Sequence, residues 1–116
     1  MKKFFVVFCI PAQAIQDWMT NVDEATRKEQ TDKMMQEWQA WMTAHQDIVV
    51  DKGGPLGKTK RVDASGVSDT RNDLNYYIVI NAESHEAAAD LFKDHPHVAS
   101  IPSAYVEVID QSRPGM

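Results

Sequence analysis

The chain has 116 residues, which is enough for one domain with one hydrophobic core and too few for two. Hydrophobic residues make up 43% and charged residues 25% of it, which is ordinary globular usage. The formal net charge of -5 disfavours binding to a nucleic acid, because the phosphate backbone is also negative.

The first predicted element is the apolar run at residues 4–10. It is rich in β-forming residues and apolar on both alternating faces, which predicts a central strand. The two lysines before it and Ala12-Gln13-Ala14 after it also fit a secretory signal peptide, and this alternative stays open. Because the run is short for such a signal and Pro11 ends it, we expect a strand.

The single cysteine, Cys9, lies in this run and cannot form an internal disulfide. Its apolar neighbours predict a buried thiol in a reducing compartment, and we therefore expect a cytoplasmic protein. No stretch of the chain approaches the ~20 apolar residues that cross a bilayer, so we expect no membrane partner.

Residues 11–20 predict a short helical turn, and a long helix follows it. Thr26 and Glu29 have the spacing of a capping box, so we expect the helix to start there and to run to about His45. Its apolar residues recur three and four positions apart, which predicts one buried face. That face consists of Met34, Trp38, Trp41, Met42 and His45, with Met35 beside it.

The middle of the chain predicts two strands on either side of a turn. Residues 47–51 predict a strand, and the glycines of residues 52–58 are available for positive φ in the turn. Residues 58–63 predict a mostly polar edge strand, whose lysines would discourage pairing with another sheet edge. Residues 64–73 predict a loop.

The last part of the chain predicts a strand, a helix and a strand. Residues 74–82 are apolar on both alternating faces, and Ser84 can cap a helix over residues 86–92. Residues 105–109 predict the last strand. The helix is expected to pack through Ala88, Leu91 and Phe92.

The predicted order β-α-β-β-α-β is the ferredoxin-like arrangement, an α+β fold with a four-stranded antiparallel sheet. We place it in one domain at residues 1–110, followed by a loose tail at residues 111–116. Two helices can cover only one face of the sheet, yet the strands at residues 4–10 and 74–82 are apolar on both. We therefore expect another copy of the chain to cover the second face, which makes a homodimer packed sheet to sheet.

Several short stretches resemble the YCII-related, or DGPF-type, family in their order and spacing. They are "GGPLGKTKRV", "NDLNYYIVINAESHEAAADLF", "HPHV" and "YVEVI". The resemblance implies a dimeric α+β barrel of ferredoxin-like protomers. It implies no single activity, because the wider superfamily holds small-molecule isomerases, lyases, dehalogenating enzymes and monooxygenases.

The chain departs from that family where a His–Asp pair is proposed to act. Residues 11–44 contain no histidine, so the family's histidine has no counterpart after the first strand. The family's Asp-Pro step aligns through Pro96 with His95 rather than with Asp94. The resemblance therefore transfers no catalytic residues, and any chemistry here needs a different set.

The stretch "KDHPHV" places Asp94, His95 and His97 around Pro96. Pro96 disfavours helical dihedrals at His95, so we expect the preceding helix to end there. An extended His-x-His could chelate a metal, but the further ligands that a site requires are not visible, and we assign no metal. The alternatives are a helix stop near the C-terminal dipole and an acid–base role for His97.

Two residues of the long helix are further candidates. His45 continues the aromatic face, and burial there would keep its imidazole neutral, as a general base requires. The alternative is a histidine hydrogen-bonded at the helix end. Trp41 could contact an aromatic ligand at a pocket mouth or could simply belong to the core.

Polar residues between the predicted strands suggest a binding surface. Lys58 and Lys60 alternate on one strand face and could attract an anionic substrate, although protection of a sheet edge is an alternative. Asn72 could line a pocket rim or form an Asx turn before the next strand.

The leading hypothesis is a cofactor-independent enzyme that moves a proton on a small molecule, as lyases and isomerases do. His45 and His97 would carry the proton. The alternative is a non-catalytic homodimer that binds or senses a small ligand, and whether the chain is an enzyme stays open. The residues expected to line the pocket are Trp41, Asn72, Asp94, His95, Lys58 and Lys60.

Overall fold

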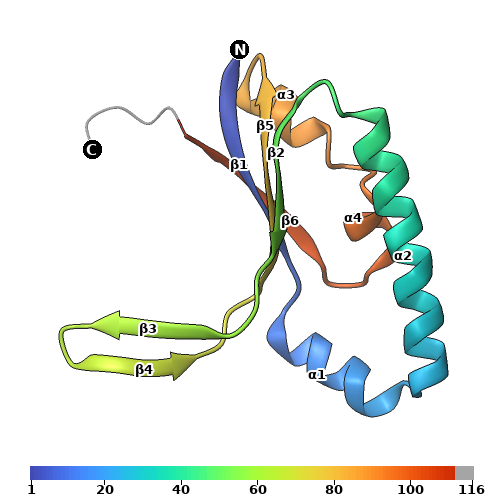
Figure 1. Cartoon of the computed structure of the whole chain (residues 1–116), viewed down its shortest axis with the longest axis vertical. Coiled ribbons are helices and arrows are strands. Elements are labelled where there is room, and N and C mark those ends of the chain that lie inside the picture. The colour runs from blue at the N-terminus through green and yellow to red at the C-terminus, as the bar shows by residue number, and fades with distance from the viewer. Residues whose placement is uncertain (112–116) are drawn as a thin grey trace.

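The computed structural model describes residues 1–111 as an α+β fold with a four-stranded antiparallel sheet and a separate two-stranded sheet (Figure 1). The first half of the chain contains β1 (Lys2–Cys9), α1 (Ala12–Asn21), α2 (Glu24–Ala44) and β2 (Val49–Pro55). The second half contains β3 (Thr59–Asp63), β4 (Gly66–Thr70), β5 (Leu74–Ala82), α3 (His85–Asp90), α4 (Pro96–Ser100) and β6 (Tyr105–Asp110).

The main sheet has the strand order β2-β5-β1-β6, so the predicted first strand is central. Phe4 lies opposite Ile80 and Val6 opposite Ile78, and these side chains point toward the helices. β1 has a strand on each side, and Phe4, Val6 and Phe8 on its helix-facing side belong to the core. The fully enclosed core consists of Phe4, Val6, Phe8, Ile78, Ile80, Ala82, Ala88 and Phe92.

The long helix α2 covers this core with the face that its periodicity predicts. Trp38, Trp41 and Met42 pack against the core, whereas Met35 is 65% exposed. The predicted capping box at Thr26 is wrong. The helix begins one turn earlier, where the Asp23 carboxylate accepts a hydrogen bond from the Thr26 backbone N–H at 3.0 Å.

Several boundaries of the short elements also differ from the prediction. Residues 12–21 form a helix of 10 residues rather than a single turn. The strand β2 continues to Pro55 through part of the predicted turn, and Gly53 has a φ of 64° inside it. In residues 1–111 the other glycine with positive φ is Gly66. Ser84 caps α3 as predicted, with its hydroxyl accepting from the Ala87 N–H.

The strands β3 and β4 form a projecting hairpin that the sequence did not predict. Residues 58–63 were expected at an edge of the main sheet and residues 64–73 as a loop, but β3 pairs only with β4. Local pairing around the turn at Gly66 gives both strands a partner despite the polar composition. We call residues 57–71 the arm, which extends away from the body of the molecule in Figure 1.

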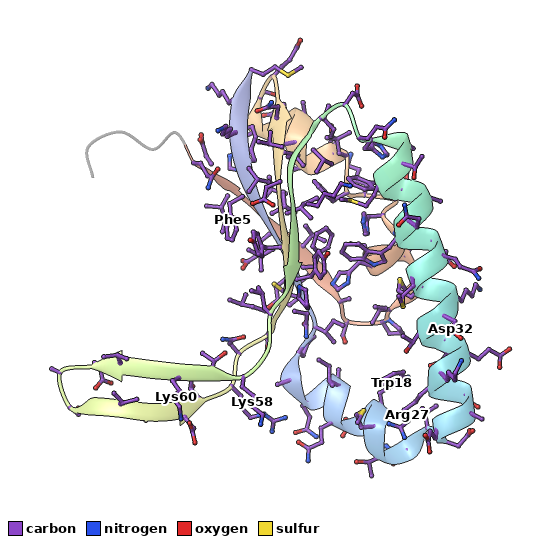
Figure 2. All side chains as sticks on the ribbon, viewed as in Figure 1. Phe5, Trp18, Arg27, Asp32, Lys58 and Lys60 are labelled. Carbon is purple, nitrogen blue, oxygen red and sulfur yellow. The ribbon has the colours of Figure 1, made fainter. Side chains whose placement is uncertain are left out.

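The second face of the main sheet carries apolar side chains, and none of the helices in residues 1–111 covers it. The helices α2, α3 and α4 lie on the other side of the sheet (Figure 1). Phe5 points away from them in Figure 2, and its ring lies 5.3 Å from that of Tyr77. Ile109 lies opposite Phe5 and is 47% exposed. We call this surface the open face.

Among residues 1–111, no helix has both the length and the apolar composition that a membrane span requires. The predicted tail at residues 111–116 lies outside the described residues except for Gln111. The backbone N–H of Gln111 donates to the carbonyl of Lys3 at 3.2 Å, so the chain is still held against β1 at this point.

Candidate functional site

The stretch around Pro96 starts a helix instead of only stopping one. The helix α3 ends at Asp90, earlier than predicted, and α4 begins at Pro96. His95 is the N-cap of α4, and its Nδ1 accepts a hydrogen bond from the His97 backbone N–H at 3.0 Å. Proline suits the first helical position, because it needs no hydrogen-bond partner there and its φ is already helical.

His97 lies inside the protein, where it joins α4 to β1. It is 3% exposed, and its Nε2 lies 2.9 Å from the Cys9 carbonyl oxygen. A carbonyl only accepts, so the Nε2–H of His97 donates and the tautomer is fixed. Burial lowers the pKa of His97, and the hydrogen bond to Cys9 opposes that shift. The ring proton therefore holds two elements together.

His95 is fully buried among aromatic rings. Its ring centroid lies 4.7 Å from both Trp38 and Trp41 and 4.9 Å from Phe8. Burial, followed by the charges of His97 and His45, lowers its pKa to about 3, so the imidazole is neutral. Because Nδ1 accepts a hydrogen bond, the proton is on Nε2, which has no hydrogen-bond partner within residues 1–111.

His45 lies at the C-terminal end of α2 and is hydrogen-bonded there. Its Nδ1 is 2.8 Å from the Trp41 carbonyl oxygen, and its ring stacks on the Trp41 ring at 4.0 Å. Trp41 also packs on Phe92, in the core. These contacts agree with the alternative that His45 is a histidine hydrogen-bonded at the helix end. A catalytic role for His45 stays a prediction. We call His45, His95, His97, Trp38, Trp41 and Phe8 the histidine cluster.

The remaining predicted residue of this stretch, Asp94, is exposed in the turn before α4. Its exposure separates it from the buried rings of His95 and His97. Within the described part of the chain, no three His, Cys, Asp or Glu side chains lie close enough together to hold a metal ion.

A cleft of about 640 Å³, lined by both polar and apolar residues, lies where the arm joins the body, beside the start of α1. Three of the predicted pocket residues, Lys58, Lys60 and Asn72, line it together. Lys60 pairs with Asp69 at 2.6 Å, whereas Lys58 forms no ion pair with any residue of 1–111. We call this space the arm cleft, and Figure 2 labels both lysines.

The arm cleft also contains a residue that the sequence did not single out. Arg71 lines it and donates to the Gln16 side chain of α1 at 3.1 Å. Asn72 donates to the Thr59 hydroxyl, and its own side-chain oxygen accepts from the Leu74 N–H. Asn72 thus forms the predicted Asx turn and also lies on the cleft rim. Composition alone did not distinguish Arg71 from other loop residues.

A second, more apolar space of about 830 Å³ lies between α1, α2 and residues 100–103. Ile15, Trp18 and Met34 line it, and Trp18 links the two helices by donating to the Gln30 side chain at 2.7 Å (Figure 2). Ser103, at its margin, has a φ of 68°, which is unusual for a residue other than glycine. We call this space the helix cavity. No histidine lines either space.

Comparisons with models of protein families, with curated proteins and with solved structures found no match for the chain. The YCII-related resemblance therefore stays a prediction from the short motifs.

Proposed function

We propose that this chain is a non-catalytic homodimer that binds or senses a small anionic molecule in the arm cleft. The observation that carries the proposal is the convergence of Lys58, Lys60 and Arg71 on one cleft, with the Asn72 side chain on its rim. Cationic side chains form strong, charge-assisted hydrogen bonds with carboxylates and phosphates. Lys58 has its charge available for this, since no acidic residue of 1–111 pairs with it.

The surrounding charges support an anionic ligand over a neutral one. The arm has four basic and two acidic residues, and its charge of +2 leaves -7 for the rest of a chain whose total is -5. Two carboxylates weaken this preference. Asp69 neutralises Lys60, and the Asp73 carboxylate accepts a hydrogen bond from the Ala12 N–H at 3.2 Å at the start of α1.

The protomer that we propose has ferredoxin-like topology and belongs to the YCII-related family. The antiparallel order β2-β5-β1-β6, with helical segments between β1 and β2 and between β5 and β6, supports the topology. We also propose that two copies pack their open faces together as a dimeric α+β barrel in the cytoplasm. The support is the apolar surface at Phe5, Tyr77 and Ile109, which no helix of residues 1–111 covers.

The second candidate is the cofactor-independent enzyme of lyase or isomerase type, with His45 and His97 as proton carriers. One observation favours it, namely a buried ring nitrogen of His95 without a hydrogen-bond partner in residues 1–111. Buried polar atoms are rarely left without partners, and exceptions often have a chemical role. Against it, His45 and His97 bind backbone carbonyls and line neither space.

Calorimetric titration with a panel of small carboxylates and phosphate monoesters tests the proposal. We expect at least one member to bind the wild type, and Lys58→Ala to weaken that binding about tenfold, since charge-assisted hydrogen bonds contribute about 1.5–3 kcal/mol. Lys52→Ala is the matched control, because Lys52 is an exposed lysine outside the cleft.

Binding that is unchanged in Lys58→Ala, or a panel in which nothing binds at millimolar concentration, would refute the anion site. The enzyme candidate is tested on the same panel by following consumption of each compound. Turnover that disappears in a folded His97→Asn variant would support the enzyme over the binding protein.

A further inference from the structure

We propose that the arm binds a second copy of this chain, with its apolar pair Val62 and Val67 against the body of the partner. This inference rests on the proposed homodimer and specifies what holds it together. The open face supplies the broad contact, and each arm supplies a clamp.

The arm has little support from its own protomer. All residues from 60 to 69 are exposed, and the arm's two strands pair only with each other. Val62 and Val67 lie opposite one another and are 75% and 67% exposed. An isolated two-stranded hairpin is marginally stable in water, so a projecting one with an apolar cross-strand pair gains stability from a partner surface.

The dimensions of the protomer also indicate a missing partner. Its radius of gyration is 16.0 Å, whereas a compact chain of this length has about 13 Å. Its accessible surface is 8216 Å², against about 6,400 Å² for a compact monomer of its mass. The surplus exceeds the ~800 Å² that each partner buries in a standard interface.

The direction and charge of the arm favour a second copy over another protein. In Figure 1 the arm projects on the same side of the main sheet as the open face. A two-fold dimer that joins the two open faces therefore also brings the arm of each copy against the other copy. The arm is basic at +2 and the rest of the chain is acidic at -7. The arm of one copy therefore approaches a partner body of opposite charge, which includes the exposed Glu107 of β6.

Sedimentation velocity over a concentration series tests the clamp. We expect the wild type to be a dimer, the Val62→Asp/Val67→Asp double variant to raise the dimer dissociation constant at least tenfold, and 1 M NaCl to weaken the dimer. Met35→Asp is the matched control, because Met35 is an exposed apolar residue on α2, on the helical side. Circular dichroism checks folding, and Val62→Thr/Val67→Thr keeps β propensity if the aspartates disturb the hairpin.

The outcomes separate the clamp from the homodimer. A wild type that stays monomeric at all concentrations overturns both. A dimer that Ile109→Asp on the open face dissociates, while the folded arm variants associate as the wild type does, overturns the clamp and leaves the homodimer. Ligand affinity in the arm cleft is measured separately, so neither result depends on the anion site.

Discussion

The histidine cluster and the arm differ in how firmly the chain holds them. In the cluster, His95 and His97 lie in the core between α2, α4 and β1, and every ring touches another ring. In the arm, charged side chains extend into solvent from two strands that pair only with each other. Residues that suggest chemistry from their type alone are therefore enclosed in the core in one region and exposed to solvent in the other.

The largest effect that sharpens this comparison is the loss of Phe8. Its ring lies 4.5 Å from that of Trp38 and 5.4 Å from that of His97, and it is fully buried. Phe8→Ala should lower the free energy of unfolding by about 3–5 kcal/mol, because it removes buried apolar surface and leaves a cavity. Urea denaturation measures the change, and Ser68→Thr at an exposed position of the arm should alter it by no more than about 0.5 kcal/mol. Equal effects of the two substitutions would contradict the distinction between the regions.

The second prediction concerns pH. The pKa of His95 is about 3 in the folded chain and about 6.5 when the chain is unfolded. Between these values the unfolded chain binds a proton that the folded chain does not, so the free energy of unfolding falls as the pH drops from 6.5 toward 3. The lowered pKa of His97 acts in the same direction. Above pH 6.5 neither histidine adds a pH dependence.

His95→Asn isolates this contribution, because asparagine also caps a helix N-terminus but does not titrate. Denaturation curves between pH 3.5 and 7 should show a shallower loss of stability in this variant than in the wild type. The comparison subtracts the carboxylates, which are common to both chains. Parallel pH profiles for the two proteins would count against burial of a neutral His95.

The third prediction concerns the strand that leads into the arm. Gly53 in β2 has a φ of 64°, and an added Cβ would lie 1.6 Å from the Tyr77 carbonyl oxygen. Gly53→Ala should therefore lower the free energy of unfolding by more than about 1 kcal/mol. Gly54→Ala is the neighbouring control, since a Cβ there meets no atom within 4 Å. Thermal unfolding of both variants measures the difference, and similar midpoints would show that β2 can shift at little cost.

The sequence predicted the strands and helices whose pattern is set by burial. The predicted strands β1 and β5, which are apolar on both faces, and the Trp38–Trp41 face of α2 are confirmed, because burial in the core requires these apolar residues. The hairpin was missed, since residues 66–70 contain a single large apolar residue, Val67, and gain their strand structure from pairing with β3. The turn-forming composition of this stretch does not show that it pairs with β3.

The candidate site was likewise predicted only in part. Lys58, Lys60 and Asn72 were predicted from their polarity, and they do share the arm cleft. The histidines were predicted from their type, but the sequence could not show their partners, because the Cys9 carbonyl lies 88 positions from His97 along the chain. Proline was also ambiguous, since it can follow one helix and begin the next.

The smallest predicted effect on stability has a clear consequence for binding. The pair Lys60–Asp69 is short, but its side chains are 71% and 86% exposed. Such a surface pair contributes at most about 1 kcal/mol, so Asp69→Asn should change the unfolding midpoint very little. It should nevertheless raise the affinity of the arm cleft for a carboxylate several-fold at low salt, because Lys60 regains an unpaired charge, and salt should reduce that gain. Calorimetric titration of wild type and variant measures both effects. An affinity that stays the same or falls would mean that Lys60 does not face the ligand, which would leave Lys58 and Arg71 to bind it.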